Sequence, residues 1–116
     1  MADLKSLWFE RAEEYLSYLE SVRNLSEATV EAYRRDIGDF LEHVWEHQDS
    51  DEEIDRETVR SFIAHLSRSG LSRASINRML SALKGFFRFL VKHDVIHSSP
   101  AADIRCSGVI ASPANI

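Results

Sequence analysis

Residues 71–90 have the sequence LSRASINRMLSALKGFFRFL. Apolar side chains recur in this stretch every three or four positions, which is the spacing of one face of an α helix. These positions are Ile76, Leu80, Leu83, Phe87 and Leu90. Ser72 stands just before them, where an N-cap side chain accepts a free backbone N–H. The stretch therefore predicts an amphipathic helix from Arg73 to about His93.

A second copy of this pattern begins 46 residues earlier. Residues 25–30, LSEATV, match residues 71–76, LSRASI. The apolar positions that follow also align, so that Val30, Tyr33, Ile37, Leu41 and Val44 correspond to Ile76, Met79, Leu83, Phe87 and Leu90. The earlier copy predicts an amphipathic helix from Glu27 to His47. Two copies are too few for a repeat solenoid.

Apolar residues have helical spacing in two further segments, about Leu4 to Val22 and about Arg56 to Ser69. No segment of the chain alternates apolar and polar residues as a half-buried strand would. The three inner helix starts share a capping side chain flanked by a pair of apolar residues that fix the entry of the chain. They are Leu25-Ser26 with Val30, Ile54-Asp55 with Val59, and Leu71-Ser72 with Ile76. Gly70 stands where a left-handed residue ends a helix. The fold class predicted is all-α, with four helices.

A short fifth helix is expected after these four. Ser99-Pro100-Ala101 has the order of an N-cap followed by proline at the first helical position, and the helix would run to about Ile104. We assign residues 1–104 to one domain. Residues 105–116 are mostly small or apolar and contain Pro and Gly, so we interpret them as a linker.

The composition excludes several classes of protein. The chain has 116 residues, of which 44% are hydrophobic and 28% charged, and this suits a single globular domain. A single cysteine, Cys106, excludes a disulfide framework and fits a reducing compartment. No apolar run approaches the roughly 20 residues of a membrane span, and the first residues lack the pattern of a signal peptide. We therefore expect a cytoplasmic protein with no membrane partner.

The charges are unevenly distributed along the chain. The formal net charge is -5, yet residues 1–67 hold 7 Lys and Arg against 17 Asp and Glu, whereas residues 68–116 hold 7 against 2. A local field decides what a surface attracts within about a Debye length, ~8 Å at physiological salt. The net acidity therefore does not exclude a nucleic-acid partner for the second part.

The helix predicted over 73–93 has an outward face with no acidic residue. That face contains Ala74, Asn77, Arg78, Ser81, Lys84, Gly85, Arg88 and Lys92. Arg and Asn can bind base edges through two hydrogen bonds, whereas Lys and the free N–H groups of a helix start bind phosphate. A solvated basic face is the alternative interpretation. The helix predicted over 27–47 is less suited, because Glu27 and Glu31 lie beside Arg34 and Arg35.

Two blocks of sequence resemble a known family. Residues 23–37, RNLSEATVEAYRRDI, and residues 71–90 are similar to the N-terminal part of tyrosine site-specific recombinases of the Xer and phage-integrase kind. Ser99-Pro100-Ala101 stands where that family commonly has Asn-Pro-Ala. The resemblance covers about Leu7 to Ile104.

This resemblance implies a core-binding domain with a SAM-like helical fold, the N-terminal half of a clamp around duplex DNA. In the family the second and fourth helices cross the major groove. A separate C-terminal domain carries the catalytic tyrosine and uses no metal or nucleotide cofactor, and four subunits bridge two DNA sites. On this reading residues 105–116 lead toward that domain, and the chain alone positions DNA without catalytic activity.

The candidate DNA-binding residues follow from the basic face and the resemblance together. From the earlier helix they are Ser26, Thr29 and Arg34, and from the later helix Ser72, Arg73, Ser75, Asn77, Arg78 and Lys84. We assign base contacts to Asn77 and Arg78 and phosphate contacts to Arg73 and Lys84. Gly85 would permit close approach of the helix to DNA.

Other motifs have simpler interpretations. Residues 65–68, HLSR, have the letters of the family's catalytic HxxR motif but lie in the half of the protein that binds DNA, not in the catalytic half. Residues 43–47, HVWEH, match an inverted zincin motif, but the sequence offers no plausible third metal ligand. Tyr15, Tyr18 and Tyr33 are expected in the core or at its rim. The alternative function is an acidic helical module that binds a protein through the Glu-rich first two helices or through an apolar groove.

Overall fold

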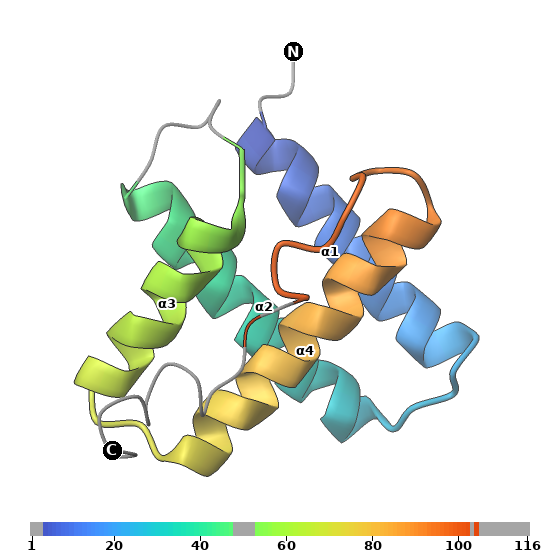
Figure 1. Cartoon of the computed structure of the whole chain (residues 1–116). Coiled ribbons are helices and arrows are strands. Elements are labelled where there is room, and N and C mark those ends of the chain that lie inside the picture. Colours follow the sequence, from blue (N-terminus) through green and yellow to red (C-terminus); the bar gives the residue numbers. More distant parts are fainter. Residues whose placement is uncertain (1–3, 48–52, 103, 105–116) are drawn as a thin grey trace. The chain divides into compact units, whose positions relative to one another are not determined.

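The computed structural model describes residues 4–47, 53–102 and 104 (Figure 1). In this part of the chain it has four α helices and no strand, which confirms the all-α prediction. They are α1 Leu4–Ser21, α2 Glu27–His47, α3 Arg56–Arg68 and α4 Arg73–Lys92. The predicted bounds of α2 are those observed, and the other three helices end one residue earlier than predicted.

The sequence repeat is also a repeat of hydrogen bonds. Before α2, Ser26 Oγ accepts the backbone N–H of Thr29 at 3.1 Å and donates to Thr29 Oγ1 at 2.9 Å. Before α4, Ser72 Oγ accepts the backbone N–H of Ser75 at 3.1 Å and donates to Ser75 Oγ at 3.1 Å. Both serines are therefore N-caps, as predicted, and each satisfies a donor that the first helical turn leaves without a partner.

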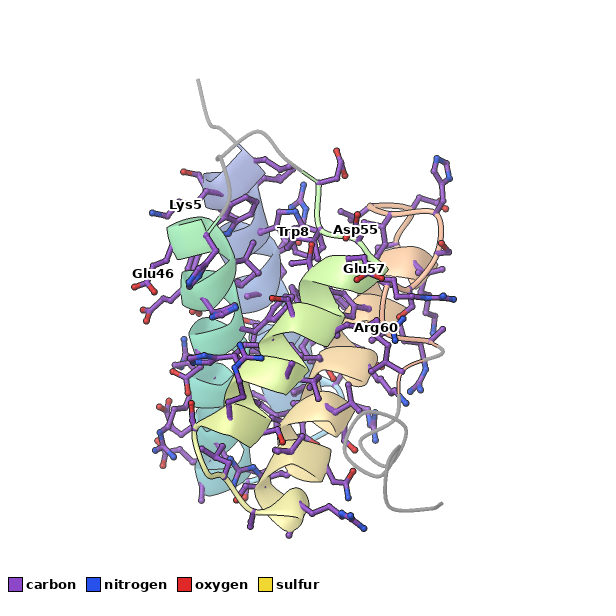
Figure 2. All side chains as sticks on the ribbon, turned by 60° about the vertical axis from the view of Figure 1, so that its left-hand side comes forward. Lys5, Trp8, Glu46, Asp55, Glu57 and Arg60 are labelled. Carbon is purple, nitrogen blue, oxygen red and sulfur yellow. The ribbon has the colours of Figure 1, made fainter. Side chains whose placement is uncertain are left out.

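Asp55 caps α3 and lies where that helix begins (Figure 2). Its Oδ1 accepts the backbone N–H of Thr58 at 3.0 Å, while Thr58 Oγ1 accepts the backbone N–H of Asp55 at 3.2 Å. This is a reciprocal capping box with threonine in place of the more usual Glu or Gln. Ile54 and Val59, the apolar pair that flanks this cap, are buried. At the start of α4, Leu71 of the corresponding pair is 38% exposed, so that pair is only partly packed.

Residues in the left-handed backbone region follow three of the helices. Gly70, with φ 89°, follows α3, and its N–H donates to the Ser67 carbonyl at 3.2 Å. Asp94, with φ 61°, follows α4, and its N–H donates to the Val91 carbonyl at 3.1 Å. In both places the backbone N–H of the next residue also donates to a carbonyl of the last helical turn. Each pair of bonds forms a Schellman motif. Asn24, with φ 57°, follows α1. The prediction for Gly70 is confirmed.

The short fifth helix is replaced by a hydrogen-bonded turn among the described residues. The Ala102 N–H donates to the Ser99 carbonyl at 3.3 Å, and the Ala101 N–H donates to Ser99 Oγ at 3.2 Å. Ser99 therefore does act as a cap, but over a tight turn and not over a helix. A segment this short cannot make enough bonds to offset the cost of helix nucleation. Residues 105–116, including Cys106, lie outside the described residues.

The chain divides into two compact units, Met1–Glu53 and Ile54–Ile116. In the first, α1 and α2 pack together as a helix pair. The apolar residues of this pair that are buried are Trp8, Ala12, Tyr15, Leu16, Leu19, Val30, Ile37, Phe40, Leu41 and Val44. Each fully buried large apolar side chain contributes about 1.5–3 kcal/mol to stability.

In the second unit, α3 packs against α4. The large buried side chains of these two helices are Val59, Phe62, Ile63, Leu66, Ile76, Met79, Leu80, Leu83, Phe86, Phe87 and Leu90. All the positions of the apolar repeat in α4 are buried, and in α2 only Tyr33 is half-buried. The apolar stripes predicted from the sequence are therefore the core faces of their helices.

Candidate nucleic-acid interface

The predicted outward face of α4 is exposed. Ala74, Asn77, Arg78, Ser81, Arg88 and Lys92 are exposed, and Lys84 and Gly85 are half-buried. The opposite, core-facing positions are at most 4% exposed. No residue of α4 is acidic. The helix therefore presents a continuous cationic and amide-bearing face while its other side anchors it in the core.

The start of α4 adds hydrogen-bond donors to this face. Arg73 is exposed in the first turn, which contains no acidic side chain. The Ser72 hydroxyl donates its proton to Ser75 Oγ, so the Ser75 hydroxyl proton is left for another acceptor. The helix dipole also favours an anion at this end. Ser72, by contrast, is occupied by its capping bonds.

Arg34 makes two ion pairs that the sequence analysis did not predict. Its Nη1 lies 2.5 Å from Glu13 Oε2 of α1, and its Nε lies 3.2 Å from Glu31 Oε2 of α2. The hydrogen bond to Glu13 is the largest cause of a raised pKa for Arg34. This guanidinium therefore joins α1 to α2. Sequence reasoning missed Glu13, because that residue is 21 positions away along the chain and no local pattern links the two.

The second half of α2 is acidic on its exposed side. Burial raises the pKa of Asp39, and the nearby charges of Glu42 and Asp36 raise it further, while Arg35 opposes them. Asp36 itself is only 1% exposed and was not singled out from the sequence. The C-terminal half of α2 therefore repels polyanions, unlike the same half of α4.

A small pocket of about 170 Å³ lies at one end of the α1–α2 pair. Its lining residues are Lys5, Phe9, Glu42, Trp45 and Glu46. Lys5 and Glu46 project on the same side of the pair (Figure 2). Two carboxylates against one ammonium group do not suit a phosphate. Trp45 Nε1 is buried without a hydrogen-bond partner among the described residues.

The other motifs have structural explanations. His43 and His47 lie on α2 with ring centroids 4.4 Å apart, and His47 Nδ1 is 2.8 Å from the His43 carbonyl oxygen. Over the ranges 4–47 and 53–102 and at residue 104, no three His, Cys, Asp or Glu side chains gather to hold a metal. His65 and Arg68 lie on the last turns of α3, and both are exposed.

Tyr15 is buried in α1, and Tyr18 and Tyr33 are half-buried, which confirms their assignment to the core and its rim.

Among the described residues, no helix is sufficiently long and apolar to span a bilayer.

Together, the capped helices and their buried apolar faces define an all-α protein over the described residues. Sequence comparison supplies the particular family. The profile of the phage integrase N-terminal SAM-like domain matches residues 12–94, and the chain belongs to this family. The matched range includes parts of both compact units.

The chain is also similar to named tyrosine recombinases. It is 38% identical over 96 residues to the tyrosine recombinase XerC of Xylella fastidiosa (strain M23), covering 80% of this chain and 32% of that protein. For XerC of Treponema denticola the identity is 33% over 93 residues, covering 80% and 30%. For XerC of Pseudomonas syringae pv. syringae it is 39% over 88 residues, covering 75% and 29%.

This chain thus corresponds to about a third of the length of these relatives and is homologous to the N-terminal part of a tyrosine recombinase. No solved structure matches it.

Proposed function

We propose that this chain is the DNA-binding half-clamp of a tyrosine recombinase, with residues 1–104 as the core-binding domain. The observation that carries the proposal is the acid-free exposed face of α4, in a chain whose formal net charge is -5. A solvated face has no need to exclude carboxylates, whereas a face that approaches phosphates does.

The chemistry of α4 suits the major groove of duplex DNA, which is about 12 Å wide and admits a helix. In the proposed complex Arg78 and Asn77 bind base edges, because guanidinium and amide groups can each make two hydrogen bonds to one base. Arg73 and Lys84 bind phosphates, and the Ser75 hydroxyl donates to a phosphate oxygen at the start of the helix. Gly85 carries no side chain that would hold the helix away.

The role of the whole protein is part of the same proposal. The relatives are named tyrosine recombinases and are about three times as long as the matched segment. We infer that the full-length protein is a tyrosine recombinase whose catalytic residues lie in a C-terminal domain outside this chain. Residues 105–116 would connect the two domains, and several subunits would assemble on DNA.

Two substitutions test the interface in the 116-residue chain. Arg78→Ala should cost about 1–3 kcal/mol of binding free energy on the cognate site and relax the preference at one base pair. Lys84→Ala should weaken binding to all sequences alike and lower the slope of log affinity against log salt by about one. Fluorescence anisotropy with labelled duplexes at low salt measures both. A half-clamp binds weakly, since it lacks the linked contacts of its other half.

Arg60→Ala on α3 is the matched control. This variant also loses one exposed arginine, but Arg60 lies 3.8 Å from Glu57 and belongs to a different helix (Figure 2). Its salt slope should equal that of the unmodified chain. If Arg78→Ala and Lys84→Ala also leave duplex affinity unchanged at low salt, α4 is not the DNA-binding helix.

A further inference from the structure

Arg34 and Arg35 are neighbours on α2 but occupy different faces of that helix. The 46-residue repeat aligns Arg34 with Leu80 of α4, and it aligns Arg35 with Ser81. Leu80 is 4% exposed and belongs to the core face, whereas Ser81 is exposed on the cationic face. The repeat therefore places Arg35, and not Arg34, on the side of α2 that corresponds to the proposed DNA-binding side of α4.

The contacts of Arg34 agree with this alignment. Its guanidinium is directed to α1, where Nη1 meets Glu13, and its Nε meets Glu31 on α2 itself. The side chains of these three residues are 43%, 63% and 58% exposed, respectively. A guanidinium already bonded to two carboxylates has little charge left for a phosphate. It does, however, neutralise Glu31, which the repeat aligns with Asn77 on the proposed DNA-binding face.

Arg35 lies in a different setting. It is exposed, and the small residues Ala28, Ala32 and Gly38 share its side of α2. A Cβ atom added at Gly38 would meet nothing within 4 Å outside the helix backbone, so the surface there is open. Small residues let a backbone approach a groove closely, as Ala74 and Gly85 do on α4. Asp39, one turn further on, limits this surface to the first half of α2.

From these observations we infer that Arg35 is the α2 residue that binds a DNA phosphate, and that Arg34 is a positioning residue that ties α2 to α1 and neutralises Glu13 and Glu31. The inference rests on the proposed DNA-binding function. It replaces Arg34 by Arg35 among the candidate DNA contacts, and it assigns Arg34 an indirect role.

Salt-dependent anisotropy titration of the 116-residue chain with duplex DNA separates the two arginines. Arg35→Ala should lower affinity roughly tenfold at low salt, as expected for loss of a charged hydrogen bond, and should lower the salt slope by about one. Arg34→Ala should lower affinity because the negative charges of Glu13 and Glu31 are then no longer neutralised. Adding Glu31→Gln should then restore affinity to within about twofold in the Arg34→Ala chain and should not restore it in the Arg35→Ala chain.

Melting followed by circular dichroism verifies that each variant is folded at the titration temperature. The inference is overturned if Arg35→Ala binds with unchanged affinity and slope, or if Arg34→Ala lowers the slope by one and Glu31→Gln does not rescue it. Lys84→Ala shows whether the assignment of Arg35 fails alone or the proposed DNA-binding function fails as well. If it lowers the slope while Arg35→Ala does not, only the assignment of Arg35 fails. If the unmodified chain does not bind the duplex, the proposed function fails with it.

Discussion

Gly70 and Gly38 differ in what their backbones require. Gly70 has φ 89°, which an L side chain adopts only with strain, although no atom would obstruct an added Cβ. Gly38 lies inside α2, again with open space around the Cβ position. Gly70→Ala should therefore destabilise the fold by about 1 kcal/mol, and Gly38→Ala should stabilise it by roughly 0.5–1 kcal/mol. Urea unfolding measures both, and equal effects of the same sign would contradict this account.

Asp39 makes stability depend on pH. Its pKa is raised, first by burial and then by Glu42 and Asp36, so the folded chain holds this proton more tightly than the unfolded chain does. The contribution of Asp39 to stability is therefore present at acid pH and is lost as the pH rises through the folded-state pKa. Asp39→Asn should raise the melting temperature at pH 7 and have little effect near about pH 3. A larger gain at the acid pH would refute this assignment.

Individual residues differ in how far the sequence could predict them. Helical periodicity alone predicts that Asn77 and Arg78 lie on the outward side of α4, and both are exposed. The ion pair between Arg34 and Glu13 could not be predicted, since it depends on how α1 packs on α2. The repeat alone aligns Arg35 with an exposed position of α4, whereas the ion pair that holds Arg34 against α1 is visible only in the structure.

At the scale of helices, the capping role of Ser72 can be separated from its place at the start of the proposed DNA-binding helix. Ser72→Ala should cost about 1 kcal/mol of stability because a backbone N–H loses its acceptor. Ser72→Asp should retain stability, since aspartate caps as well as serine and suits the helix dipole. The added negative charge should nevertheless weaken duplex binding. Denaturation and anisotropy on both variants test this, and a Ser72→Asp chain that binds DNA as well as the unmodified chain would remove this helix start from the interface.

The helices also show where local signals suffice. The starts of α2, α3 and α4 were predicted because each has a side-chain cap that acts within three residues. Ser99 provides the same local signal and does form a capping bond, yet a turn follows. A cap marks where a helix can begin. Whether a helix propagates depends on its length and on packing of an apolar face, which this short segment lacks.

At the scale of the whole chain, the boundary between the compact units is also a boundary of charge. Residues 1–53 contain fifteen Asp and Glu against five Lys and Arg, whereas residues 54–116 contain four against nine. The sequence predicted the fold class and the family from two blocks of residues. Division into two units could not be predicted from composition, because it depends on contacts between helices. The division into a domain at 1–104 and a linker stays a prediction.

Our main proposal is that the acid-free face of α4 binds duplex DNA. Its most direct test is to record amide NMR spectra of the 116-residue chain while a duplex is added at low salt. We expect chemical-shift changes concentrated in the first half of α4, with smaller changes near Ser26 and Arg35 of α2. Changes confined to the Glu-rich surfaces of α1 and α2, or no changes at all, would contradict it and favour an acidic protein-binding module.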